Sequence, residues 1–288
     1  MKLGKVIRWE FRQNVCSKQF LVMTVFIPAI IALAVFGATR AFGADKGPIT
    51  EPPPPVIIGI FLAFILFLGA FMSGVMTLYG VVKEKQSRVV EMMLSSVSAW
   101  ELMSGKMIGI GLAGMIQVAA WAITAYFVAG LFFPVSLAAL TVVHWIAYPL
   151  YFILGFLFIA SIFGTVGASI KDVHSGGAVG LAGFVPYMPM LFTALIVKQP
   201  DLLWVRIAGF FPPFTPAIML IRIGAMPIAS EGARFVPAWE IGLSLLSLAI
   251  GTLLMMRFAA KVFEVGMLMT GKSASLRELW RWGRRGAS

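Results

Sequence analysis

The sequence predicts an all-α polytopic membrane protein with six transmembrane helices, folded as a single domain over residues 1–288. Of its residues, 60% are hydrophobic and only 12% are charged, whereas about a quarter of a soluble domain is charged. The mean hydropathy is +0.93. Six apolar runs approach or exceed the roughly 20 residues that cross a bilayer as a helix, and polar segments separate them. These observations exclude an ordinary soluble domain.

Residues 1–19 are expected to form an amphipathic helix that lies in the membrane interface. Its hydrophobic and basic residues fall on opposite arcs at the helical period. The apolar arc contains Leu3, Val6, Ile7, Phe11 and Val15, and the basic arc contains Lys2, Lys5, Arg8 and Arg12. Such a helix anchors the chain ahead of its first span.

The expected spans cover residues 20–38, 56–82, 107–133, 140–170, 177–197 and 238–256. Between the fifth and sixth spans, residues 198–237 contain too many charges and prolines to cross lipid as a regular helix. The apolar piece at 217–224 is expected to dip into the outer leaflet and return. Residues 257–288 form a basic tail with an interfacial pattern.

The distribution of positive charge predicts the orientation of the chain. Six spans place 17 of the 23 Lys and Arg residues on one side, in the N-terminus, the segments after spans two and four, and the tail. The positive-inside rule puts this side in the cytoplasm. We therefore expect an integral protein of the bacterial plasma membrane with both termini cytoplasmic.

The longest polar run in the first half of the chain is 83–106, KEKQSRVVEMMLSSVSAWELMSGK. Numbered as a helix, its polar and apolar residues form two opposite faces. The polar face contains Glu84, Arg88, Glu91, Ser95 and Ser98, and the apolar face contains Val89, Val90, Met93, Leu94 and Val97. The pattern favours a helix on the membrane surface with one face offered to a soluble partner, although an ordinary interfacial loop would also fit.

This run resembles the coupling-helix signature of type-2 ATP-binding-cassette (ABC) exporter permeases, and is most similar to the branch that contains sodium-extruding subunits. Ala99 departs from the proline that the family often has there. The resemblance implies a permease that couples to a separate ATPase subunit and pairs with a second copy or a related permease. The implied coupling residues are Glu84, Arg88, Glu91, Ser95, Trp100, Glu101 and Lys106.

The resemblance also implies roles for other segments. An N-terminal elbow helix in similar permeases often carries a glutamate, as Glu10 does here. The segment 198–237 would form short outer re-entrant helices with Pro213, Pro216 and Arg222. A turn containing Lys171, Asp172 and His174 would make a second cytoplasmic contact, although a plain loop is an equal alternative. Gln117 could line the pathway or simply pack between helices.

The acidic residues bear on the energy source. None of the twelve falls in the middle of an expected span, whereas carriers driven by ion gradients usually have an intramembrane carboxylate as the coupling site. The sequence GMLMTGKS at 266–273 fits the P-loop pattern, but it follows a membrane span rather than a buried strand. We therefore expect no bound cofactor on this chain, with Mg-ATP on the partner. A gradient-driven carrier or channel is the alternative.

Catalytic and metal sites are not indicated. The single cysteine, Cys16, allows no intrachain disulfide. The two histidines, His144 and His174, lack the spacing and nearby carboxylates of a metal site, and His144 is expected at an interface beside Trp145 and Tyr148. The chain is expected to be a transport subunit rather than an enzyme. No nucleic-acid partner is expected, because the basic residues cluster at span ends.

Overall fold

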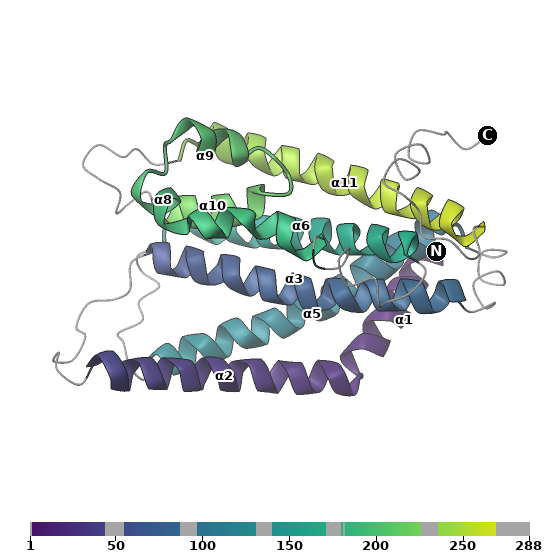
Figure 1. Cartoon of the computed structure of the whole chain (residues 1–288), viewed down its shortest axis with the longest axis horizontal. Coiled ribbons are helices and arrows are strands. Elements are labelled where there is room, and N and C mark those ends of the chain that lie inside the picture. The colour runs from purple at the N-terminus through teal and green to yellow at the C-terminus, as the bar shows by residue number, and fades with distance from the viewer. Residues whose placement is uncertain are drawn as a thin grey trace.

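The computed structural model describes residues 2–43, 55–86, 97–130, 140–170, 180, 182–225 and 236–268, and the regular structure within them is helical throughout (Figure 1). The helices are α1 (Lys2–Val15), α2 (Lys18–Gly43), α3 (Pro55–Gln86), α5 (Ala99–Gly130), α6 (Val142–Ser169), the 3₁₀ helix η2 (Val185–Phe192), α8 (Thr193–Lys198), α9 (Leu203–Ala208), α10 (Thr215–Ala225) and α11 (Ala238–Leu268). The all-α prediction is confirmed for this part of the chain.

Within the described residues, four helices are long and apolar enough to cross a membrane. They are α3, α5, α6 and α11, at the places expected for spans two, three, four and six. The segments Phe20–Ile30 and Ala182–Lys198, at the expected first and fifth spans, are apolar but shorter. Pro186 and Pro189 lie within η2. Proline has no backbone N–H to donate, and its ring clashes with the preceding turn, so a regular α-helix is disfavoured there.

The long helices run side by side along the molecule (Figure 1). α1 and the last turns of α11 lie at one end, on the right, which we call the α1 end. α8, α9 and α10 gather at the opposite end, the α10 end. α3 occupies the middle of the bundle, where it packs against α5, α6 and α10.

Close packing of the helices depends on glycine. A Cβ atom on Gly69 would lie 2.3 Å from a methyl of Val118, and one on Gly74 would lie 2.3 Å from the ring of Phe163. At Gly59 the obstacle would be backbone, because the carbonyl oxygen of Leu220 would be 2.3 Å away. Small residues of this kind let helices approach closely where lipid supplies no hydrophobic driving force between them.

Candidate functional site: ion pairs at the two ends of the bundle

The α1 end contains a buried ion-pair triad made by Glu10, Glu84 and Lys106. The ammonium nitrogen of Lys106 lies 2.5 Å from Oε1 of Glu10 and 2.9 Å from Oε1 of Glu84. The side chains of Lys106 and Glu10 are each 3% exposed, and that of Glu84 is 16% exposed. Because the three residues come from α5, α1 and α3, the triad joins the N-terminal helix to both helices that flank the 83–106 stretch.

The start of α5 brings these charges together. A Cβ on Gly109 would lie 2.8 Å from the carbonyl oxygen of Ile7 and 2.7 Å from Cβ of Glu10, so only glycine lets α1 lie this close. Gly105, one turn earlier, faces Val6 in the same way. Lys106 lies between these two glycines in sequence and reaches Glu10 across the contact. The close contacts at Gly105 and Gly109 therefore position the triad.

The first turn of α5 differs from the sequence-based expectation. The third span was expected over residues 107–133, but α5 begins at Ala99 and includes the residues from 99 to 106. Ser98 and Glu101 explain this start. The carboxylate of Glu101 accepts from the backbone N–H of Ser98 at 3.1 Å, and the backbone N–H of Glu101 donates to Oγ of Ser98 at 3.2 Å. This is a capping box, which satisfies the free donors at a helix N-terminus.

The expected coupling residues thus have different surroundings. Glu84 and Lys106 are buried in the triad, Glu101 caps α5, and the side chain of Trp100 is 38% exposed at the surface. Arg88, Glu91 and Ser95 lie outside the described residues. The expected second contact, Lys171, Asp172 and His174, also lies outside them. Glu10, noted in the sequence only as an elbow glutamate, belongs with Glu84 and Lys106.

A second contact at the α1 end holds the ends of three helices together. The ammonium of Lys85 donates to the carbonyl oxygen of Ala168 at 3.0 Å, near the end of α6. Gly266 packs on the same carbonyl, since a Cβ there would lie 2.6 Å from the Ala168 oxygen. Gly266 opens the GMLMTGKS sequence, and it lies inside α11 rather than after a strand.

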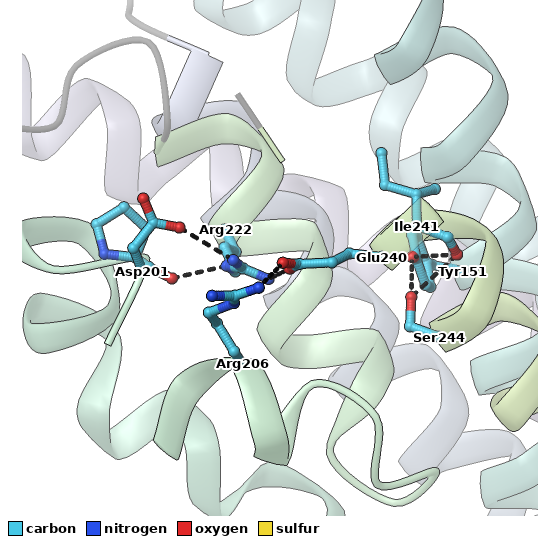
Figure 2. Close-up of polar contacts among 8 residues, drawn as sticks. Tyr151, Asp201, Arg206, Arg222, Glu240, Ile241 and Ser244 are labelled. Carbon is cyan, nitrogen blue, oxygen red and sulfur yellow. Dashed lines mark hydrogen bonds and ion pairs between the residues drawn. The ribbon is translucent and has the colours of Figure 1, made fainter. Parts of the chain in front are cut away.

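The α10 end contains a charge network of two arginines and two carboxylates (Figure 2). Arg222 on α10 donates to Oε2 of Glu240 on α11 at 2.6 Å and to Oδ1 of Asp201 at 3.1 Å. Its Nε donates to the backbone oxygen of Pro200 at 2.6 Å. Arg206 on α9 contacts the other carboxylate oxygen of Glu240. The network therefore ties α9, α10 and the residues before α9 to the start of α11.

The members of this network differ in their exposure to solvent. The side chains of Arg222 and Glu240 are 1% exposed, whereas those of Arg206 and Asp201 are 37% and 50% exposed. The inner pair is fully desolvated and satisfied by hydrogen bonds, as a buried ion pair must be. Beside it, the hydroxyl of Tyr151 lies 2.6 Å from Oγ of Ser244 and bonds α6 to α11 (Figure 2).

The segment between α9 and α10 penetrates deep between α6 and α11. Pro212 packs on Gly251, and Pro216 packs on Gly155. Each glycine lies roughly 20 Å along its helix from the α10 end, at 1.5 Å per residue. From there α10 returns toward Arg222, and every residue of α10 is buried. Of the expected re-entrant residues, Pro216 and Arg222 are therefore buried in helix contacts, and Pro213 is partly buried in the turn.

The remaining candidates lie in the interior. Gln117 is 4% exposed on α5, one turn before the fully buried Trp121. Nδ1 of His144 lies 2.8 Å from Oγ1 of Thr141 at the start of α6, and its ring meets Tyr148 edge-on. In the part of the chain that the structure describes, no group of three or more His, Cys, Asp or Glu residues is placed to hold a metal ion.

Sequence reasoning missed the partners of Arg222. Asp201 belongs to the charges of residues 198–237 that are too polar for lipid, and Glu240 belongs to the twelve acidic residues outside the middle of the expected spans. The sequence did indicate that Arg222, if buried, would need a carboxylate partner. Spacing could not show which carboxylate, because Glu240 is 18 residues away in the chain.

The fold and its charges together define an integral membrane protein. Its long helices are apolar along their length, and the ion pairs described above lie near the two ends of the bundle. A family model described as "ABC-2 family transporter protein" matches residues 48–261, most of the chain. The chain belongs to this family.

Two curated relatives match over most of this chain. It is 28% identical over 242 residues to the protein YhaP of Bacillus subtilis, covering 76% of this chain and 53% of YhaP. It is 25% identical over 230 residues to the protein MJ1024 of Methanocaldococcus jannaschii, covering 77% of this chain and 53% of that protein. The chain spans about half the length of these relatives, and both are described as uncharacterized. The sodium-extruding branch therefore stays a prediction.

Proposed function

We propose that this chain is the permease subunit of an ATP-driven exporter. It pairs with a second permease, forms the translocation pathway, and receives energy from a separate ATPase subunit at the α1 end. The observation that carries the proposal is the Glu10–Lys106–Glu84 triad, which links both helices flanking the 83–106 stretch to α1. A force applied to that stretch would therefore reach three helices at once.

The burial of the triad supports its role in transmission rather than in docking. Side chains that are 3% exposed have no surface for a soluble partner, so Lys106 and Glu10 act inside the permease. Docking falls to exposed residues, of which Trp100 is one, and to Arg88, Glu91 and Ser95 by resemblance. The coupling residues therefore form two sets. The surface residues bind the ATPase subunit, and the buried residues transmit its movement to the membrane helices.

A six-span topology with a re-entrant pair at the outer surface completes the proposal. Two findings support it. α1 and the end of α11 lie at the same end of the bundle, as an even number of crossings requires (Figure 1). The turn between α9 and α10 reaches Gly155 and Gly251, about two-thirds of the roughly 30 Å hydrocarbon core from the α10 end, before the chain returns.

The direct test is charge reversal of Glu91. The Glu91→Lys variant is compared with wild type in inside-out vesicles that also contain the ATPase subunit, using a panel of Na⁺, peptides, lipids and hydrophobic drugs. We expect ATP hydrolysis to continue while ATP-driven uptake falls about tenfold or more, because a reversed charge opposes the complementary charge of the ATPase surface. A tenfold loss corresponds to about 1.4 kcal/mol.

Glu264→Lys provides the matched control. Glu264 is exposed on α11 at the same end of the bundle, outside the 83–106 stretch, and its reversal should leave uptake unchanged. Full coupled uptake by Glu91→Lys would contradict the proposed role of the stretch. Substrate movement by this chain alone, abolished by ionophores and indifferent to ATP, would instead establish a gradient-driven carrier.

A further inference from the structure

A groove of about 630 Å³ lies between α1 and α5, away from the triad. Its lining is apolar with a single cation: Gly4, Ile7, Arg8 and Phe11 come from α1, and Leu112, Met115, Ile116 and Ala119 come from α5. Leu112 and Ile116 are 42% and 49% exposed, so the wall formed by α5 is open to its surroundings. The volume falls within the roughly 300–1,000 Å³ of pockets that bind small molecules.

The shape of the groove matches one leaflet of a bilayer. α1 crosses α5 at Gly105 and Gly109, and the groove continues along α5 from there to Ala119. The distance from Gly109 to Ala119 is about 15 Å at 1.5 Å per residue, which is half of the roughly 30 Å hydrocarbon core. An extended acyl chain that starts at α1 would end near Ala119.

The charges of α1 determine which headgroup would suit the mouth of the groove. Arg8 is exposed there, and Lys5 and Arg12 are exposed on the same helix. Glu10, the one acidic residue of α1, is buried against Lys106. The exposed charge of α1 is therefore wholly positive, and arginine binds phosphate through a planar fork of N–H donors.

We propose that this groove binds an anionic phospholipid, with its phosphate on Arg8 and one acyl chain along Leu112, Ile116 and Ala119. The site is more specific than the general attraction of a basic helix for a membrane. Ile7 lines the groove, and its carbonyl oxygen packs on Gly109 beside Glu10, so a bound lipid would brace the contact that holds the triad. The proposal does not depend on an ATPase partner.

Two variants test the site by different means, with a third as control. Arg8→Gln removes the cation from the groove. Gly4→Leu fills the groove without changing charge, and no atom lies within 4 Å of a Cβ at this position, so the side chain fits the fold. Arg12→Gln removes an equal charge from the same exposed helix, one turn away and outside the groove lining.

The full chain is incorporated into nanodiscs that contain phosphatidylglycerol and phosphatidylcholine. Native mass spectrometry then counts the lipids that stay bound to the released protein, and the bound fraction gives the relative affinity for phosphatidylglycerol. We expect Arg8→Gln to lower phosphatidylglycerol affinity about fivefold, the effect of one basic contact, and Arg12→Gln to lower it less than about twofold. Gly4→Leu should also lower the affinity, because its side chain occupies the space of the acyl chain. Unchanged melting temperatures would show that each variant is folded.

Three results would overturn the proposal. Equal losses in Arg8→Gln and Arg12→Gln would show diffuse surface attraction rather than a site. Full retention of phosphatidylglycerol by Gly4→Leu would show that the groove is not where the lipid lies. A change of oligomeric state in Gly4→Leu, with lipid retention unaltered, would assign the groove to a second copy of the chain.

Discussion

Arg222 and Glu240 form a buried ion pair between α10 and α11, with 2.6 Å between Nη1 and Oε2 and each side chain 1% exposed. Glu240 also contacts Arg206 of α9, so one carboxylate connects both arms of the α9–α10 segment to α11 (Figure 2). The Glu10–Lys106–Glu84 triad has the same form at the other end. The ion pairs of these described residues therefore join helices near the two ends of the bundle.

Replacing Glu240 should strongly destabilise the α10 end. Glu240→Gln removes the main counter-charge of a buried arginine, and losing one partner of such a pair costs about 3 kcal/mol or more. We expect a clearly lower melting temperature in detergent, followed by tryptophan fluorescence. Asp201→Asn is the control, because Asp201 is 50% exposed and its pair should contribute at most about 1 kcal/mol. Equal melting temperatures for Glu240→Gln and wild type would contradict the buried pair.

The triad should show a non-additive response to substitution. Lys106→Met removes the ammonium between two carboxylates, whereas Glu10→Gln leaves Lys106 with Glu84. We therefore expect the single lysine change to be the more destabilising. The double variant should be more stable than the sum of the two single effects predicts, by about 1 kcal/mol or more. Denaturant or thermal unfolding of all four proteins measures this, and strict additivity would show that the contact contributes nothing.

Gly59 should tolerate no side chain. Gly59→Ala would place a methyl 2.3 Å from the carbonyl oxygen of Leu220 and force α3 and α10 apart. The expected cost is about 1–3 kcal/mol, typical of overpacking. Gly242→Ala on α11 meets no atom within 4 Å and should be neutral or stabilising by about 0.5–1 kcal/mol through its helix propensity. If both changes have the same effect on the melting temperature, the close approach of α10 to α3 is wrong.

Thiol labelling tests the proposed topology. Cys16 is exposed between α1 and α2 at the α1 end, and Gln199 is exposed at the α10 end. A membrane-impermeant maleimide should label Cys16 in inside-out vesicles but not in intact cells. The Cys16→Ser/Gln199→Cys variant should show the reverse. Labelling of both positions from one side would require an even number of crossings between them and would contradict the five that the proposed topology places there.

The sequence was sufficient for features that depend on local pattern. Apolar length predicted α3, α5, α6 and α11, and the opposite arcs of residues 1–19 predicted α1. The apolar pattern did not predict where α5 begins. The Ser98–Glu101 capping box starts this helix at Ala99, so it includes residues 100–102. Within the expected fifth span, Pro186 and Pro189 lie in a 3₁₀ helix, whose extent the apolar pattern alone did not indicate.

The sites were predictable as residue types but not as pairs. The family resemblance singled out Glu84, Lys106 and Arg222. Glu10, which pairs with Lys106, is 96 residues away from it, and Glu240, which pairs with Arg222, is 18 residues away from it. Charge and spacing identify a residue that needs a partner. Only the packing of α1 on α5 and of α10 on α11 decides which partner it has.

Cross-linking to the ATPase subunit tests the central claim most directly. Cysteine is placed at Ser95 or at Gln199 in the Cys16→Ser background, and the purified complex is treated with a short thiol–amine cross-linker. The account predicts that Ser95→Cys joins the ATPase subunit and that Gln199→Cys, at the opposite end of the bundle, does not. A cross-link from Gln199→Cys, or none from Ser95→Cys in a complex that still contains the ATPase, would contradict it.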